Sequence, residues 1–325
     1  MNERQKILEL LKEEKITVEQ ADTLLAALEH NKTPRSAASK VLEKNPLDEL
    51  KNIGEKVSSA VAQSLGEWRK TVEQQIENWP FNNNASSVMV STEVVLPDEV
   101  ENITLATSNG DMSVNVWDES YVRLVVRARV KTDSLLEGKR VLNKALQSSQ
   151  TEADYELVVI HGHKDGVLGA GIDVYVPKQM GKIHLRTQNG NLQGDSVHAL
   201  ELDLETVNGG VWLDNSAVKR IHLRTQNGNV DLHHSLSEET KTVYVSVKNG
   251  TIDCRGFSSQ LRVKGVAKSV VGRVDVTGDQ FITEFEDKNR QRSVRFEYIP
   301  LNEALENDAA RVQLETRHGS VRVRG

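Results

Sequence analysis

The sequence feature that most constrains the fold is a nine-residue segment that occurs twice. Ile183–Asn191 returns unchanged as Ile221–Asn229, 38 positions later, and a weaker copy, Leu202–Gly209, lies midway between them. A fixed period of about 20 residues is typical of repeat architectures. We therefore expect much of this chain to stack copies of one small unit.

Each copy alternates apolar and polar residues on both sides of an Asn-Gly pair. Alternation with period two predicts strands that bury one face, and Asn-Gly suits a tight corner or a two-residue hairpin turn. The same signature recurs at Ile103–Gly110 and at Val312–Gly319, where His318 replaces Asn. Aligned on the glycine, the copies form apolar columns: Ile183, Leu202, Ile221 and Val243, then Leu185, Leu204, Leu223 and Val245.

A hairpin meander and a β-solenoid both fit a single unit. The near-constant spacing and the like-on-like columns favour the solenoid, in which each coil of the chain stacks on the one before. We therefore predict a mainly β protein built as a β-solenoid-like stack of roughly 20-residue repeats.

Polar columns support the same stacking. In parallel coils about 4.8 Å apart, side chains of opposite sign would alternate on the outer face and form a structural ladder. The alternative, a metal or acid–base site built from the His and Asp side chains, is not needed to explain the pattern. We expect no catalytic residue, no metal ligand and no cofactor. The ladder residues are His184, Arg186, Asp203, Glu205, His222 and Arg224.

Composition limits the kind of core, the type of partner and the state of the cysteine that we expect. Hydrophobic residues make up 38% of the 325 positions and aromatic ones only 4%, which suits thin, stacked β-structure better than a thick globular core. The net charge of −6 argues against nucleic acid as the main partner. Cys254 is the single cysteine and falls in an inward column, so we expect a buried thiol.

The chain starts directly with charged helical sequence, and no run approaches the 18 apolar residues of a membrane span. No signal peptide or transmembrane segment is recognised. We expect a cytoplasmic protein, with peripheral attachment to the membrane as an option.

Three regions are predicted. Residues 1–30 form a helical hairpin whose second helix opens on the capping box Thr17–Gln20, and this hairpin is too small to be very stable alone. Residues 31–86 hold linkers and a long amphipathic helix. Residues 87–325 form the β-strand-repeat domain, with an inserted helix at 133–150, and the repeat becomes irregular after Gly250 and between 284 and 311.

The amphipathic helix opens on Asn45-Pro46 and ends at Pro80, and its apolar stripe would extend about 50 Å. Three interpretations stay open: packing on the solenoid, self-association into a homo-oligomer, or contact with a membrane surface or membrane protein. Residues 46–79 hold four basic against six acidic side chains, which weakens attraction to anionic lipids. The hypothetical interaction residues are Leu50, Ile53, Val57, Val61, Leu65, Trp68, Val72, Ile76 and Trp79.

The most site-like cluster is the segment His161–Asp165, among the glycines of a loop at 162–171. Its His-x-His spacing is a weak metal signal and it lacks a phosphate-loop spacing. A hairpin tip is the favoured interpretation.

These features together resemble a known family. The Thr-x-Asn-Gly repeats, the inserted helix and the strand Ile172–Pro177 look like the bacterial putative-adhesin β-strand-repeat family. Lys6–Leu11 and Lys15–Leu25 are similar to the short helical domain that heads its YvlB/LiaX-type members. The resemblance covers about residues 1–30 and 88–325. It implies a β-solenoid that acts by binding in the cell-envelope stress response of Gram-positive bacteria, without enzymatic activity or catalytic residues.

The leading hypothesis is a non-enzymatic binding scaffold whose N-terminal helices contact a membrane or a membrane protein. A surface or secreted adhesin is the first alternative. A carbohydrate-active β-helix enzyme is the second, although Asp203 and Glu205 are flanked by His and Arg in the ladder rather than forming a free acid and base.

Overall fold

The structure is a computed structural model that describes residues 87–161, 166–286, 291–300 and 309–325. Outside these residues lie the predicted helical hairpin at 1–30, the linkers and amphipathic helix at 31–86, and residues 162–165 of the His161–Asp165 cluster. The chain divides into two compact units, Met1–Asn82 and Asn83–Gly325, and the second contains everything described below.

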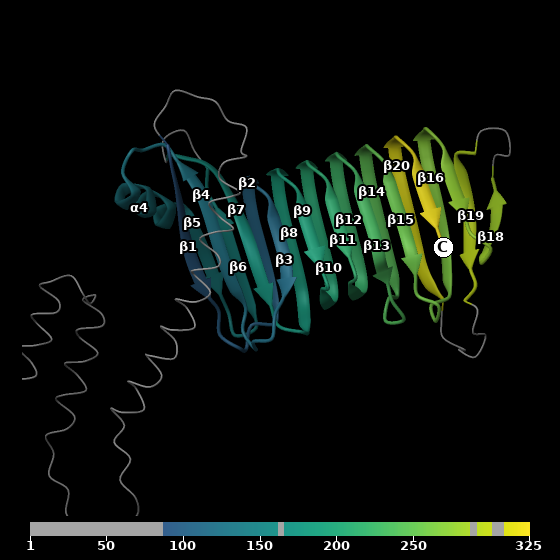
Figure 1. Cartoon of the computed structure of the whole chain (residues 1–325), viewed down its shortest axis with the longest axis horizontal. Helices are drawn as coiled ribbons and strands as arrows, with labels where there is room; N and C mark the ends of the chain where they lie inside the picture. Colours follow the sequence, from purple (N-terminus) through teal and green to yellow (C-terminus); the bar gives the residue numbers. More distant parts are fainter. Residues whose placement is uncertain (1–86, 162–165, 287–290, 301–308) are drawn as a thin grey trace, which may run out of the picture. The chain divides into compact units, whose positions relative to one another are not determined.

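Two sheets face each other across one apolar core (Figure 1). In spatial order, the ten-stranded sheet consists of β1 (Val88–Val95), β4 (Arg123–Val130), β7 (Val167–Val176), β3 (Met112–Val116), β9 (Leu192–Asp195), β11 (Val211–Asp214), β13 (Val230–Leu236), β15 (Ile252–Phe257), β21 (Val321–Arg324) and β17 (Val274–Thr277). The eleven-stranded sheet consists of β18 (Phe281–Phe285), β19 (Ser293–Tyr298), β16 (Val263–Val271), β20 (Ala310–His318), β14 (Thr242–Asn249), β12 (Ala217–Asn227), β10 (His198–Asn208), β8 (Met180–Asn189), β2 (Asn102–Asn109), β6 (Asp154–Val159) and β5 (Leu146–Gln150).

The repeats form a stack of coils, which confirms the predicted solenoid-like fold. One coil is a strand in the eleven-stranded sheet, an Asn-Gly corner, and a strand in the ten-stranded sheet. Successive coils pair in parallel, with Leu202 of β10 between Ile183 of β8 and Ile221 of β12. A hairpin meander would give antiparallel pairs, so the parallel register excludes it for these repeats.

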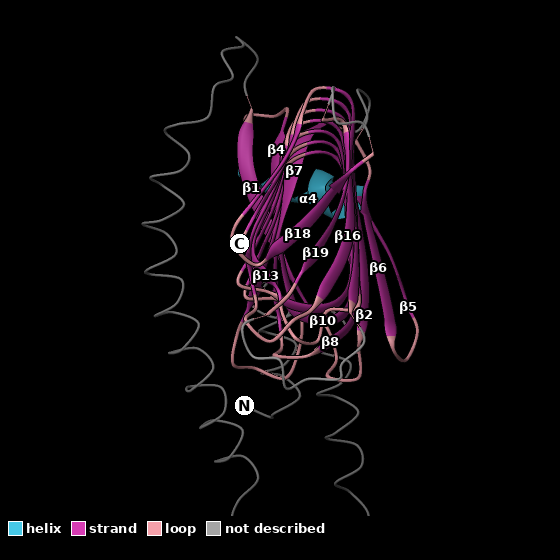
Figure 2. Ribbon diagram, turned by 90° about the vertical axis from the view of Figure 1, so that its right-hand side faces the viewer, coloured by secondary structure: helices cyan, strands magenta, loops and turns pink. Residues whose placement is uncertain are grey.

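The inward columns form the core between the two layers, which Figure 2 shows nearly end-on. Ile183, Leu202 and Ile221 are fully buried. Cys254 is buried among them, as predicted from its column. Aliphatic side chains make up most of this core, which agrees with the low aromatic content.

The corners are joined by a ladder of asparagine side chains. The Asn208 amide donates to Asn189 Oδ1 over 2.7 Å, and Asn227 donates to Asn208 Oδ1 over 2.8 Å. Asn249 continues the ladder, and His318 completes it with a 3.1 Å contact to Asn249 Oδ1. Each amide therefore both donates and accepts along the stack, which explains why Asn precedes glycine in each copy.

An insertion after β3 builds one end of the stack. β4 pairs antiparallel with both β1 and β7, and α4 (Leu135–Ala145) packs chiefly against β1. The Ser134 hydroxyl caps α4 by accepting from the Glu137 amide. The helix is shorter than the 133–150 expected from sequence, because Leu146–Gln150 leave it to pair antiparallel with β6 as strand β5.

The other end departs from sequence order. The C-terminal coil, β20 with β21, lies between the β14–β15 coil and the β16–β17 coil, and in Figure 1 the yellow β20 lies among green strands. The region expected to be irregular from 284 holds β19, which pairs antiparallel with β16 and β18. These strands lack Asn-Gly corners, so the repeat signature does not mark them.

Candidate functional site

The outer face of the eleven-stranded sheet carries polar side chains in rows that run across the strands. Strand alternation places inward residues in the core and the residues between them in solvent. Parallel pairing then sets equivalent residues of successive coils side by side. The six residues proposed as a ladder all lie on this face.

In one row, Glu205 lies between Arg186 and Arg224. Its carboxylate oxygens are 3.8 Å from Arg186 and 3.9 Å from Arg224. All three side chains are partly or largely exposed, so each pair contributes at most about 1 kcal/mol.

A second row alternates in the same way and was missed by the sequence reasoning. Glu201 lies 3.0 Å from Lys182 and 3.2 Å from Arg220. The pKa of Glu201 is lowered, first by the hydrogen bond from Lys182. The signal was present, because these three residues share the 19-residue spacing of the other columns.

The third row holds His184, Asp203 and His222. The register sets Asp203 between the two histidines. Asp203 Oδ1 and His184 Nε2 are nevertheless buried without a hydrogen-bond partner. Across the described residues, no three His, Cys, Asp or Glu side chains converge in a group suited to a metal ion.

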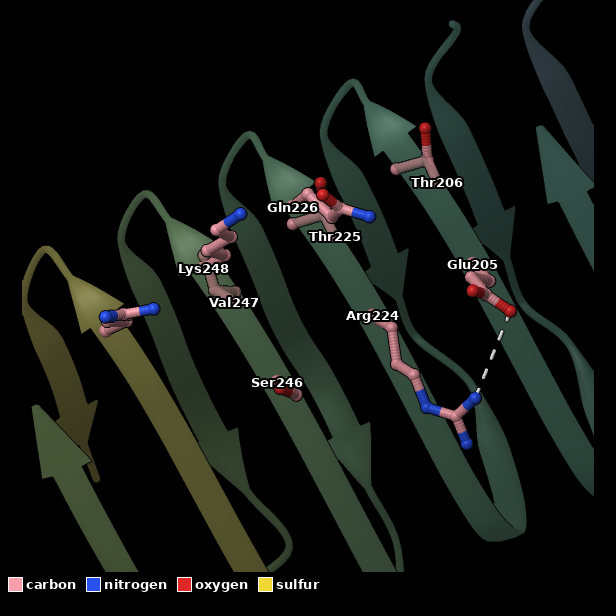
Figure 3. A pocket seen from close by; sticks show the side chains of 9 residues that line it. Glu205, Thr206, Arg224, Thr225, Gln226, Ser246, Val247 and Lys248 are labelled. Atoms are coloured by element: carbon pink, nitrogen blue, oxygen red, sulfur yellow. Dashed lines mark ion pairs between the residues drawn. The ribbon is translucent and has the colours of Figure 1, made fainter. Parts of the chain in front are cut away.

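A shallow hollow of about 310 Å³ opens on this face, where β10, β12, β14 and β20 run side by side (Figure 3). Figure 3 shows Arg224 reaching toward Glu205 at one side, with Gln226 farther along the same strand and Lys248 on the next strand. The lining is mostly polar, with three cationic side chains and one carboxylate: Glu205, Thr206, Arg224, Thr225, Gln226, Ser246, Val247, Lys248 and Arg317.

Lys248 and Arg317 lie side by side on adjacent strands in the lining of the hollow. The flanking pairs Val247–Thr316 and Asn249–His318 fix this register between β14 and β20. Both side chains are exposed, and neither forms an ion pair within the described part of the chain. Their row holds two neighbouring cations and, on either side, the uncharged Gln226 and Val270, so it is the part of the face most suited to an anionic ligand. Sequence reasoning missed them because Lys248 and Arg317 come from copies 69 positions apart.

His161 begins the cluster that the sequence singled out. The Thr107 hydroxyl donates its proton to the Ala170 carbonyl oxygen. It therefore accepts the second hydrogen bond, which His161 Nε2 donates to Thr107 Oγ1 over 3.0 Å. Burial lowers the pKa of His161, and its Nδ1 is buried without a partner. The lowered pKa favours the neutral form of His161, which lies against the end of β2, and residues 162–165 lie outside the described structure.

On the opposite sheet, Asp231 of β13 faces Asp253 of β15. Burial and then the Asp253 charge raise the pKa of Asp231. Arg324 binds the Asp253 carboxylate at 3.0 Å, so one member of the pair is neutralised. The arrangement is a second polar feature that the sequence reasoning did not identify.

Comparison with protein families gives two matches. A model described as Toastrack DUF4097 matches residues 69–324, and a model described as a SHOCT-like domain matches residues 2–33. No curated protein matches the chain. Within the described residues, no helix has the length and apolar character needed to cross a bilayer.

Several solved structures are similar to this chain. A putative cell adhesion protein from Clostridium sporogenes ATCC 15579 is 15% identical with a TM-score of 0.41, over 72% of this chain and 99% of that one. A putative adhesin from Bacteroides fragilis NCTC 9343 is 10% identical with a TM-score of 0.36, over 74% and 98%. A putative lipid binding protein from Parabacteroides distasonis ATCC 8503 is 7% identical with a TM-score of 0.26, over 71% and 96%.

Proposed function

The chain belongs to the Toastrack DUF4097 family, and from that premise we propose that it is a non-enzymatic binding scaffold of the bacterial cell-envelope stress response. The observation that carries the binding role is the cationic hollow at Lys248 and Arg317 on a continuous parallel sheet. Parallel strands bonded on both sides hold such side chains at fixed spacing, as a binding site requires.

The N-terminal region supplies the second half of the proposal. Residues 2–33 match a SHOCT-like domain, and the sequence from Leu50 to Trp79 carries a long apolar stripe. An apolar surface of that extent marks an interaction site when nothing covers it. We propose that this region contacts a membrane protein or the membrane surface while the β-domain binds its ligand.

A pull-down from bacterial membranes tests the arrangement. Full-length chain and a chain lacking residues 1–80 are incubated with solubilised and intact membranes, and bound protein is measured. We expect the full-length chain to be retained and the shortened chain to be lost. Equal retention of both chains would contradict a membrane contact through the N-terminal helices.

Substitutions in the stripe sharpen this test. Val61→Glu with Leu65→Glu should abolish sedimentation with membranes, because a charge at a dry contact costs several kcal/mol. Ser59→Glu with Gln63→Glu adds the same charge off the stripe and should change little. The melting temperature of the β-domain is recorded in parallel. A large drop in it for the stripe variant alone would mean that the stripe packs on the β-domain instead.

A surface or secreted adhesin is the first alternative. Cell fractionation separates the two hypotheses, because protein found only in the medium or on the outer surface would favour the adhesin. The carbohydrate-active enzyme is the second alternative. Turnover of a cell-wall polysaccharide that is lost in Asp203→Asn would favour it over the scaffold.

A further inference from the structure

We propose that the hollow on the eleven-stranded sheet binds a phosphate ester of a small polyol, with Lys248 and Arg317 as its main ligands. This inference deepens the proposed binding role, on which it rests, by naming the ligand class of the β-domain. The nine lining residues come from four strands that are consecutive in the stack, so the sheet itself builds the site.

The first step of the argument is the like-charge pair. Strand register sets Lys248 beside Arg317 at the spacing of neighbouring strands, roughly 4.8 Å between backbones. Like charges opposite each other on one face are unfavourable for the fold. The outer neighbours in the same row, Gln226 and Val270, carry no charge that could compensate. A bound anion would remove this repulsion.

A second Lys–Arg pair lies on the same face, away from the hollow. Lys264 of β16 faces Arg311 of β20, and Glu297 of β19 is the register neighbour of Lys264 and forms its ion pair with Arg262. Elsewhere on the face, Glu201 and Glu205 each lie between two cations. Beside Lys248 and Arg317 the corresponding positions hold the uncharged Gln226 and Val270, and Gln226 lines the hollow together with the two cations.

The donors around the hollow fit a phosphate. A guanidinium offers a planar fork of N–H groups to two phosphate oxygens, and an ammonium offers three donors to a third. The Gln226 amide and the Ser246 hydroxyl line the same space and can bond the hydroxyls of a polyol. The volume of about 310 Å³ is at the small end for ligand sites, which limits the ligand to a few carbons beyond the phosphate.

A flat anionic membrane fits this place poorly. Glu205 is part of the lining, and Glu315 lies on β20 in the neighbouring row, where it accepts a hydrogen bond from Gln313. A continuous anionic surface laid on the sheet would meet these carboxylates together with the cations. A single phosphate group can enter between them, so we assign the site to a discrete ligand.

The test is a calorimetric titration of the full chain with glycerol 3-phosphate at low ionic strength, where charge interactions are least screened. Lys248→Gln with Arg317→Gln should weaken binding by at least about tenfold, since two charge-assisted contacts are removed. The matched control, Lys264→Gln with Arg311→Gln, removes the same two charges from the same face and should bind within about twofold of the unmodified chain. Lys248→Arg with Arg317→Lys keeps both charges and should retain most of the affinity.

Three results would overturn the proposal. The unmodified chain does not bind glycerol 3-phosphate, or Lys248→Gln with Arg317→Gln and the control variant lose affinity equally. The third is that glycerol, which has no phosphate, binds as strongly as glycerol 3-phosphate. Vesicles of phosphatidylglycerol form a separate arm. If only vesicle sedimentation depends on Lys248 and Arg317, the ligand is a lipid surface and the small-ligand assignment fails. Circular dichroism melting confirms that each variant remains folded.

The proposed scaffold role is tested by a different measurement, the membrane pull-down. A chain that binds glycerol 3-phosphate through Lys248 and Arg317 but is absent from membrane pull-downs keeps this site and contradicts the membrane contact. A chain retained by membranes with no phosphate binding loses only the assignment of the hollow.

Discussion

The Thr206 hydroxyl donates a hydrogen bond to the Gly190 carbonyl oxygen, 2.8 Å away in the preceding coil. The contact repeats along the stack, with Thr225 on Gly209 at 2.8 Å and Thr316 on Gly250 at 2.9 Å. Each threonine is buried and sits two residues before the residue that precedes its corner glycine, which is Asn208, Asn227 or His318. One side chain thereby satisfies a corner carbonyl that lies out of reach of the strand ladders.

We predict that Thr206→Val lowers the free energy of unfolding by about 1–3 kcal/mol, because it leaves the Gly190 carbonyl without its donor. The two side chains are nearly the same size, so the effect reports the hydroxyl. Urea unfolding followed by circular dichroism measures it. Thr206→Ser keeps the hydroxyl and is expected to lose less. A valine variant as stable as the parent would show that water replaces the donor at this corner.

The glycines at the Asn-Gly corners, which lie against one another in successive coils, give a second prediction. A Cβ on Gly209 would overlap the backbone carbonyl of Gly190, which cannot move without displacing the next coil. We expect Gly209→Ala to cost at least about 3 kcal/mol or to prevent folding. Gly194→Ala is the control. A Cβ added at Gly194 would lie 2.9 Å from Cδ1 of Leu213, at the end of a side chain that can shift. Comparable losses in both variants would contradict the role of the close backbone approach.

These contacts explain why the repeats could be read from sequence. Asn208 and Gly209 contact their equivalents in the preceding coil, and Thr206 bonds the Gly190 carbonyl of that coil, so every copy is under the same constraint. The C-terminal coil was recognised for the same reason, through Thr316 and Gly319. Its place in the stack was not predictable from the pattern, because every coil presents the same edges. Likewise, Leu146–Gln150 pair with an insertion strand, and no periodic signal encodes that choice.

The candidate site was predictable only in part. The Arg186–Glu205 and Glu205–Arg224 neighbours follow from one spacing, and the register places them side by side. Lys248 and Arg317 became neighbours only because β20 returns to lie beside β14. A site formed by strands that are distant in sequence depends on coil order, which the repeat pattern leaves open.

Cys254 offers a prediction from ionisation. Complete burial raises the pKa of its thiol to about 12, so the native chain should not react with thiol reagents near pH 8. Since the thiol of the unfolded chain ionises near pH 9, its contribution to stability is present below about pH 9 and is lost between about pH 9 and 12. The Cys254→Val variant, measured over the same pH range, shows which part of the decline belongs to the thiol. Rapid labelling of the folded chain would contradict the burial.

The Glu205 row provides a test of coil register in solution. Glu205→Arg places three arginines in one row in place of the two ion pairs at 3.8 and 3.9 Å, and should lower stability by about 1 kcal/mol. Adding Arg186→Glu and Arg224→Glu to the same chain restores alternation with all signs reversed, and we expect it to recover most of the loss. The effect should shrink at high salt, because the side chains are partly exposed. Thermal melting at low and high salt measures both chains. A triple variant that melts no higher than Glu205→Arg would mean that these three side chains are not neighbours, and so that β8, β10 and β12 do not stack in this register.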